Sequence, residues 1–183
     1  MSSRETPPMR CDLPRAAFAG FTAGYIMALA GYWIEAVLGI GEINFAYAGL
    51  RYVAGNRAGW WIVGIVFHLI DSTLLGLLYA GIVQPSLAPW TARLGRLRGG
   101  VVGGVAFAAS VWLILAMLVA MPFMGAGVFG RRTGSVRPAL AALILHLLYG
   151  MFLGFVYARP ERCAPNPAPA AGGPQPSLNP GAR

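Results

Sequence analysis

Four long apolar runs constrain what this chain of 183 residues can fold into more than any other feature of its sequence. The runs cover residues 16–40, 60–83, 99–121 and 138–158. An α-helix rises about 1.5 Å per residue and needs roughly 20 residues to cross a hydrocarbon core, so each run is long enough. Because unpaired backbone groups are costly in lipid, all four runs are predicted to be helices. The expected fold is an all-α membrane protein with four transmembrane helices packed in a bundle.

The charged residues support this assignment and argue against a soluble domain. They make up 11% of the chain, whereas a soluble domain carries roughly 25%. All 14 basic side chains are arginines, and they lie between and beside the apolar runs without forming one basic face. Arginines next to transmembrane helices are typical of contact with a lipid bilayer. We therefore expect the bilayer, and no nucleic acid, as a partner.

The arginines also predict the orientation of the chain. The N-terminal tail, the second loop and the C-terminal tail hold nine of them, and the first and third loops hold five. Since positive charge accumulates on the cytoplasmic side, both termini are predicted to be cytoplasmic. Residues 1–15 form a polar tail before the four-helix domain of residues 16–159, and the proline-rich residues 160–183 are expected to be disordered. Cys11 and Cys163 lie in these tails outside any zinc or thioredoxin-type motif.

The first loop carries a weaker helical signal. Ile43, Tyr47, Leu50 and Val53 or Ala54 recur at helical spacing. This pattern predicts a short amphipathic helix at the outer membrane interface.

An internal repeat relates the second and fourth runs. Residues 68–80 and 146–158 share six of thirteen positions without a gap, among them a His, a Gly and a Tyr. The first and third runs match more weakly, with Gly20 in the place of Gly103. A helix pair that recurs after an even number of crossings keeps its orientation. Two parallel helix-pair repeats are therefore expected, related by a pseudo-twofold axis along the membrane normal.

Small residues four positions apart predict close helix packing. Such pairs let helix backbones approach where lipid provides no hydrophobic drive to associate. They are Gly20/Gly24, Gly99/Gly103, Gly100/Gly104 and Gly150/Gly154, with Gly76/Ala80 as a variant. His68 and His146 each share a helix face with one of these glycines, so both are expected to point towards the packed interior.

Three motifs carry a resemblance to a known family. Arg98-Gly99-Gly100 opens the third run, the sequence MPFMGAGVFG follows at residues 121–130, and the second and fourth runs each contain a His followed by Gly-x-x-Tyr-Ala. In these motifs the chain resembles a family of small bacterial four-helix integral membrane proteins catalogued as a domain of unknown function. The resemblance covers roughly residues 15–159. It implies a multi-pass protein of the bacterial inner membrane and brings no activity with it.

Ionisable residues inside the apolar runs are the candidates for a functional site, because such residues are costly in the membrane. Glu35, His68, Asp71 and His146 all fall in the outer half of their runs or near the middle. In a purely structural interpretation the two histidines hydrogen-bond across helices, Asp71 pairs with His68 or Tyr149, and Glu35 reaches the membrane interface. Such polar contacts between helices contribute about 0.6 kcal/mol each.

Two functional interpretations compete with the structural one. In the first, His68 and His146 are paired ligands of a metal ion or a haem, and the thioethers of Met117 and Met121 favour copper. In the second, Glu35, His68 and Asp71 relay protons or bind a cation in a small channel or carrier. The sequence identifies no particular cofactor.

Enzyme signatures are absent from the sequence. It contains no P-loop, no G-x-S-x-G, no HExxH and no nucleotide fingerprint after a strand, so we expect no enzymatic activity. The expected role is that of a small structural or accessory subunit of a larger membrane complex, with other membrane subunits or a second copy as partners. The alternative is a metal- or haem-binding protein, or a small ion or proton transporter.

Overall fold

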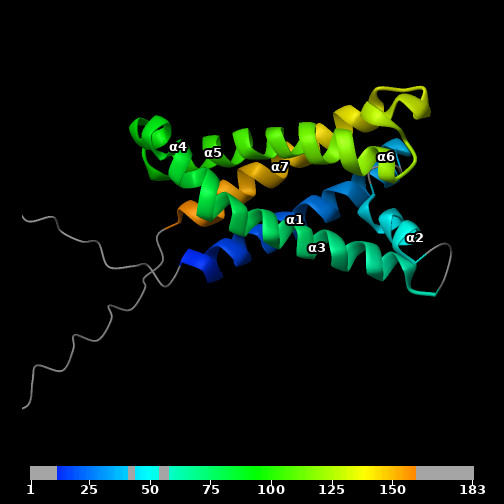
Figure 1. The fold of residues 1–183 in the computed structure, drawn as a ribbon, viewed down its shortest axis with the longest axis horizontal. Helices are drawn as coiled ribbons and strands as arrows, with labels where there is room; N and C mark the ends of the chain where they lie inside the picture. Colours follow the sequence, from blue (N-terminus) through cyan, green and yellow to red (C-terminus); the bar gives the residue numbers. More distant parts are fainter. Residues whose placement is uncertain (1–11, 41–43, 54–57, 160–183) are drawn as a thin grey trace, which may run out of the picture.

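Four long helical segments dominate the structure, a computed structural model that describes residues 12–40, 44–53 and 58–159. The segments Leu13–Leu38, Trp60–Leu87, Arg96–Phe123 and Arg137–Ala158 are long and apolar enough to cross a membrane. They lie lengthwise beside one another (Figure 1), and the described residues contain no strand. The prediction of an all-α fold with four helices long and apolar enough to span a membrane is confirmed.

The first helix, α1 (Asp12–Leu38), begins earlier and ends earlier than expected. Its first turn contains an acidic residue and Pro14, both of which suit a helix N-terminus. The expected polar tail of residues 1–15 is therefore helical from Asp12 on, and residues 1–11 lie outside the described part. The helix stops at Leu38 because Gly39 takes a left-handed conformation (φ +67°), and its N–H donates to the carbonyl of Glu35 at 2.8 Å.

The second span runs further than the sequence indicated. It consists of α3 (Trp60–Leu78), the π-helical turns Tyr79–Val83 and α4 (Gln84–Thr91), and a 3₁₀ turn, Ala92–Leu94, follows. The apolar run ends at Val83, but the helix continues beyond it, with Pro89 inside α4. The wide π turns, in which the N–H of Gln84 donates to the carbonyl of Tyr79, let the helix continue into the prolines.

The third span also changes from α-helical to the wider π-helical turns along its length. It begins after Gly95 (φ +75°) as α5 (Arg96–Val111), continues as a π-helix over Trp112–Ala120 and ends in α6 (Met121–Phe123). A 3₁₀ segment, Val128–Thr133, leads to α7 (Arg137–Ala158). These spans exceed the expected 99–121 and 138–158 by a few residues at most.

The first loop folds back onto the start of α3. It contains a 3₁₀ turn, Phe45–Tyr47, and the short helix α2 (Ala48–Tyr52), where a short helix was predicted. Gly49 and Gly64 allow this contact, because a Cβ on Gly64 would lie 2.3 Å from the carbonyl oxygen of Ala46. Ile43 and Ala54 of the predicted helix, like the expected tail of residues 160–183, lie outside the described residues.

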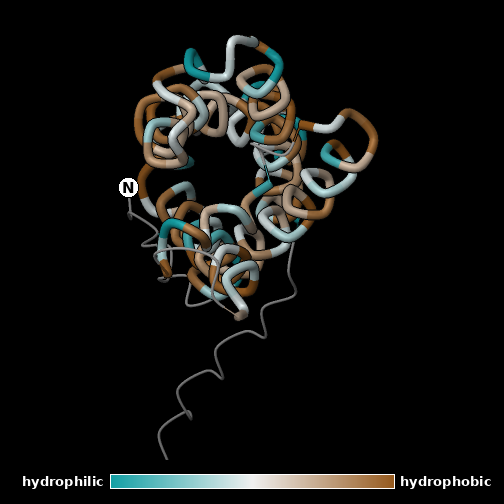
Figure 2. Tube along the Cα trace, turned by 90° about the vertical axis from the view of Figure 1, so that its right-hand side faces the viewer, coloured by the Kyte–Doolittle hydropathy of each residue, from teal (hydrophilic) through white to brown (hydrophobic). Residues whose placement is uncertain are grey.

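The four spans form a bundle that is open on one side. The helix α7 packs against both α1 and α5, and α1 packs against α3, whereas α3 and α5 barely touch. The end-on view in Figure 2 shows the spans around a common axis. Both described ends of the chain lie beside α4, at what we call the terminal end, and α2 and α6 lie at the opposite, loop end (Figure 1).

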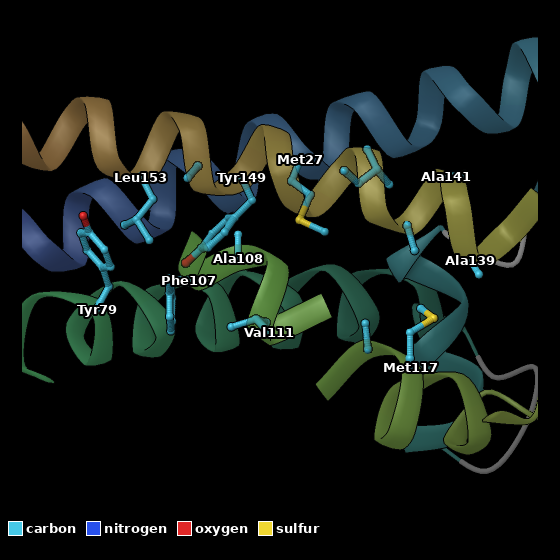
Figure 3. Close-up of a cluster of buried hydrophobic side chains, with 14 of the residues drawn as sticks. Met27, Tyr79, Phe107, Ala108, Val111, Met117, Ala139, Ala141, Tyr149 and Leu153 are labelled. Carbon is cyan, nitrogen blue, oxygen red and sulfur yellow. The ribbon is translucent and has the colours of Figure 1, made fainter. Parts of the chain in front are cut away.

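A buried core closes the middle of the bundle. Its largest fully buried side chains are those of Tyr79, Met117, Leu145, Tyr149 and Leu153. Figure 3 shows much of the buried core, to which all four spans contribute, including Met27 of α1. Tyr149 donates a hydrogen bond across the bundle to the carbonyl of Ser72 at 2.8 Å, which ties α7 to α3.

Candidate functional site

A cavity lies at the loop end, on the side where α3 and the third span do not pack together. It comprises two hollows of about 180 and 540 Å³ that share both histidines in their linings. The first loop closes one side, and α7 forms the back. The polar residues that line it are Asn44, Tyr52, His68, Asp71, Ser72, His146 and Tyr149. The remaining lining is apolar and aromatic, as in pockets that bind small ligands.

His68 projects from α3 and is held on two sides. Its Nε2 lies 3.1 Å from the carbonyl oxygen of Gly24, and its ring stacks on Phe45 with centroids 3.7 Å apart. Because a carbonyl can only accept, Nε2 carries the proton. Nδ1 makes no hydrogen bond within the described residues and holds the lone pair of a neutral imidazole.

His146 on α7 is fixed in the opposite tautomer. Its Nδ1 lies 2.7 Å from the carbonyl oxygen of Ala142, one turn earlier in the same helix, and therefore donates. Nε2 then holds the lone pair of the neutral ring. The side chain is buried, as the sequence predicted, and it lines the same cavity as His68.

Asp71 lies one turn from His68 and lines both hollows. Its carboxylate makes no hydrogen bond within the described residues. The structural interpretation expected a pair with His68 or Tyr149, and that pair is not formed. It lies near Tyr52 of α2: burial raises the pKa of the Tyr52 phenol, and the negative charge of Asp71 raises it further. Asp71 therefore brings a carboxyl group to the cavity lining.

The two candidate methionines, Met117 and Met121, differ in their access to the cavity. Met121 lines the smaller hollow together with Met124, whereas Met117 is fully buried in the core and is not part of the lining. Figure 3 shows Met117 within the apolar cluster. Of the thioethers that the sequence singled out, only Met121 reaches the cavity.

Glu35 is also placed apart from His68 and Asp71. Its carboxylate accepts hydrogen bonds from the side-chain amide of Asn44 and, at 3.1 Å, from the hydroxyl of Tyr47. These bonds join the end of α1 to the first loop. The hydrogen bond to Glu35 and the charge of Glu35 raise the pKa of the Tyr47 phenol. Glu35 does not line the cavity, so a direct relay through Glu35, His68 and Asp71 is not assembled.

Several lining residues were missed by sequence reasoning. Phe45, Tyr52 and Asn44 come from the first loop, and Phe123 comes from the end of the third span. One signal was available: Asn44 caps the 3₁₀ turn, its side chain accepting from the N–H of Ala46 at 3.0 Å, and Asn is a preferred residue for that role. Nothing in the sequence indicated that the loop folds over His68.

The cavity lining contains several groups that can bind a metal ion. Two imidazole lone pairs and a carboxylate line it, beside the thioethers of Met121 and Met124. Among the residues that the structure describes, no three His, Cys, Asp or Glu side chains lie close enough together to hold a metal ion. Any metal site must therefore combine the histidines with a thioether or a ligand from solvent.

Comparison of the sequence with family models, with curated proteins and with solved structures found no match.

Proposed function

We propose that this chain is a multi-pass membrane protein that binds a soft or borderline transition-metal ion in the loop-end cavity. The observation that carries the proposal is the pair of histidines, each of which donates one ring N–H to a backbone carbonyl and keeps the other nitrogen as an acceptor. Metal-binding histidines are held in this way, because the hydrogen bond fixes both the tautomer and the ring.

The surrounding groups favour a soft ion over a hard one. Imidazole nitrogens suit copper and zinc, thioethers select copper(I), and magnesium or calcium would need several oxygen ligands. Met121 and Met124 supply the thioethers, and the carboxylate of Asp71 offsets positive charge. A haem fits less well, because Nε2 of His68 is already bonded to Gly24.

The experiment is a metal titration of the protein purified in mild detergent. We expect one copper(I) ion to bind per chain in competition with a chelator. The affinity for copper(I) should fall about tenfold or more in His68→Gln and in His146→Gln. Met121→Leu should also weaken copper(I) binding. Met151→Leu is the matched control, because Met151 lies exposed on the lipid-facing side of α7.

Elemental analysis and an absorption spectrum of the protein from its native membrane complete the test. Zinc binding that needs both histidines but not Met121 would keep the site and change the metal. The absence of stoichiometric metal, of a Soret band and of any metal affinity in the wild type would refute the proposal.

We also infer that the bundle consists of two parallel helix-pair repeats, supported by matching contacts. A Cβ on Gly76 would meet the carbonyl oxygen of Ala16 at 2.6 Å, and one on Gly154 would meet that of Gly100 at 2.0 Å. A Cβ on Gly20 would likewise meet Ser72, and one on Gly104 would meet Gly150. These contacts favour Gly104, one residue later than Gly103, as the counterpart of Gly20.

A second candidate function is that of an accessory subunit in a larger inner-membrane complex. The open side of the bundle favours it, because α3 and the third span leave Leu74, Leu115 and Val119 exposed around the cavity. A partner helix or a second copy would cover this side. Purification from the native membrane, analysed by mass spectrometry, should then recover a companion protein or a dimer. A monodisperse monomer with no companion would exclude this role.

A further inference from the structure

A second cavity lies at the terminal end, far along the bundle from the histidines. Its volume is about 760 Å³, and it is enclosed by the first turn of α1, the π turns Tyr79–Val83, α4, the start of α5 and the end of α7. No described residue lines both this cavity and the loop-end cavity. The core around Phe107 and Leu153 lies between them (Figure 3).

Two arginines give this cavity its charge. Arg15 and Arg96 line it, and none of its described lining residues is acidic. The Nε of Arg96 donates to the carbonyl of Ala158 at 2.8 Å, and Nη1 of Arg15 donates to that of Arg159 at 3.4 Å. Arg15 as a residue is nine-tenths buried, and its guanidinium carbon lies 4.7 Å from the centroid of the Tyr157 ring. Both cations are thus held in place at the C-terminus of α7.

The start of α5 adds to the positive potential. The helix follows Gly95, which provides no side-chain cap, and Gly95, Arg96 and Gly99 line the cavity. The first backbone N–H groups of a helix have no partner within the helix and carry partial positive charge. The hydroxyl of Tyr79, bonded to the carbonyl of Gly100 at 3.1 Å, lies on the same wall.

We propose that this cavity binds a phosphate group. The guanidinium is suited to phosphate by its planar fork of donors, and Arg96 uses only its Nε within the described residues. The cavity lies where the second candidate span ends and the third begins. The ends of a membrane-spanning helix are expected at the level of the lipid headgroups. Basic pockets between transmembrane helices bind anionic headgroups. Leu13, Pro85 and Leu87 add an apolar wall that suits the start of an acyl chain.

The phosphate can belong to a lipid or to a free anion, and three probes separate these sources. They are dioctanoyl phosphatidylglycerol, dioctanoylglycerol without the phosphate, and inorganic phosphate, each added to the purified protein in phosphate-free buffer. Binding is measured through the rise in melting temperature as the probe concentration increases. We expect the phosphatidylglycerol to bind and the dioctanoylglycerol not to bind. Binding of inorganic phosphate alone would assign the site to a free anion.

Three variants test whether the cavity is the site. Arg96→Gln should weaken binding about fivefold or more, whereas Arg131→Gln, the same charge change at an exposed position of the opposite end, should not. Gly81→Leu keeps both arginines and adds a bulky side chain to the cavity lining, at a position where a Cβ meets nothing within 4 Å. It should weaken binding as well.

Two results would overturn the proposal. One is an equal loss in Arg96→Gln and Arg131→Gln with no effect of Gly81→Leu, which would mean diffuse attraction to the whole molecule. The other is no binding of either phosphate probe to the wild type. Metal binding by His68 and His146 would be unaffected by either result, since the two cavities are separate.

Discussion

At the scale of single residues, four glycines determine how closely α5 and α7 approach. A Cβ on Gly154 would lie 2.0 Å from the carbonyl oxygen of Gly100, and one on Gly104 would lie 2.2 Å from that of Gly150. These neighbours are backbone atoms and cannot rotate away. Side chains larger than hydrogen at these positions therefore require the two helices to separate.

Gly154→Ala should destabilise the fold by about 1–3 kcal/mol, the usual cost of overpacking. The measurement is reversible unfolding in detergent. Gly81→Ala is the matched control, because its added methyl meets no atom within 4 Å and Ala favours helix by up to about 1 kcal/mol over Gly. Equal melting temperatures for the two variants would contradict the close packing.

Tyr149 offers a second test at this scale. Tyr149→Phe removes the hydrogen bond to the carbonyl of Ser72 and keeps the buried ring. Interhelical hydrogen bonds in membranes contribute about 0.6 kcal/mol, so a loss of that size is expected. Tyr25→Phe, at an exposed position of α1, should change nothing. A Tyr149→Phe variant as stable as the wild type would show that the hydroxyl does not link the helices.

At the scale of elements, the sequence predicted the helices well and their internal geometry poorly. The apolar length of each run is enough to predict a span, and the glycine spacing predicted the packing faces. The sequence did not predict the π-helix at Trp112–Ala120. All of its side chains are apolar, so the sequence pattern does not distinguish a π-helix from an α-helix there. Its wider turns change the direction of the residues that follow. Both Met117 and Met121 are buried in the core, and Met121 also lines the cavity.

The candidate site was predictable only where it lies within the spans. His68, His146 and Asp71 were identified because ionisable residues are conspicuous in apolar helices. Their neighbours Asn44, Phe45 and Tyr52 depend on how the first loop folds over α3, which follows from the contact of Gly64 with Ala46. Sequence periodicity contains no information on such a contact between elements.

The link between α1 and the first loop should respond to alkaline pH. Tyr47 donates to Glu35 only while its phenol is protonated, and its pKa is raised above the ordinary value of about 10. The Tyr47–Glu35 hydrogen bond is therefore complete below that ordinary value and is lost as the pH rises through the raised pKa, whereas the bond from the Asn44 amide remains. Tyrosinate absorbance of the wild type minus that of Tyr47→Phe gives the titration curve. The midpoint should fall towards 10 in Glu35→Gln, and an unchanged midpoint would show that Glu35 does not set it.

At the scale of the whole molecule, the two described ends of the fold meet. Arg15 in the first turn of α1 donates to the carbonyl of Arg159, just beyond α7. The four candidate spans correspond to an even number of crossings, which predicts that both termini lie on the same side of the membrane. Which side this is depends on the distribution of arginines, which predicts the cytoplasm.

The two native cysteines test this orientation without any engineered label. Cys11 and Cys163 are the only cysteines of the chain. In the sequence, Cys11 precedes the four spans and Cys163 follows them. A membrane-impermeant maleimide should label neither in intact cells and both in inverted membrane vesicles. Cys11→Ser and Cys163→Ser assign each signal to its terminus, and solubilised protein gives the full extent of labelling. Labelling of both in intact cells would reverse the orientation and place the arginine cavity on the outside. Labelling of only one would rule out an even number of crossings, and with it the four-span fold.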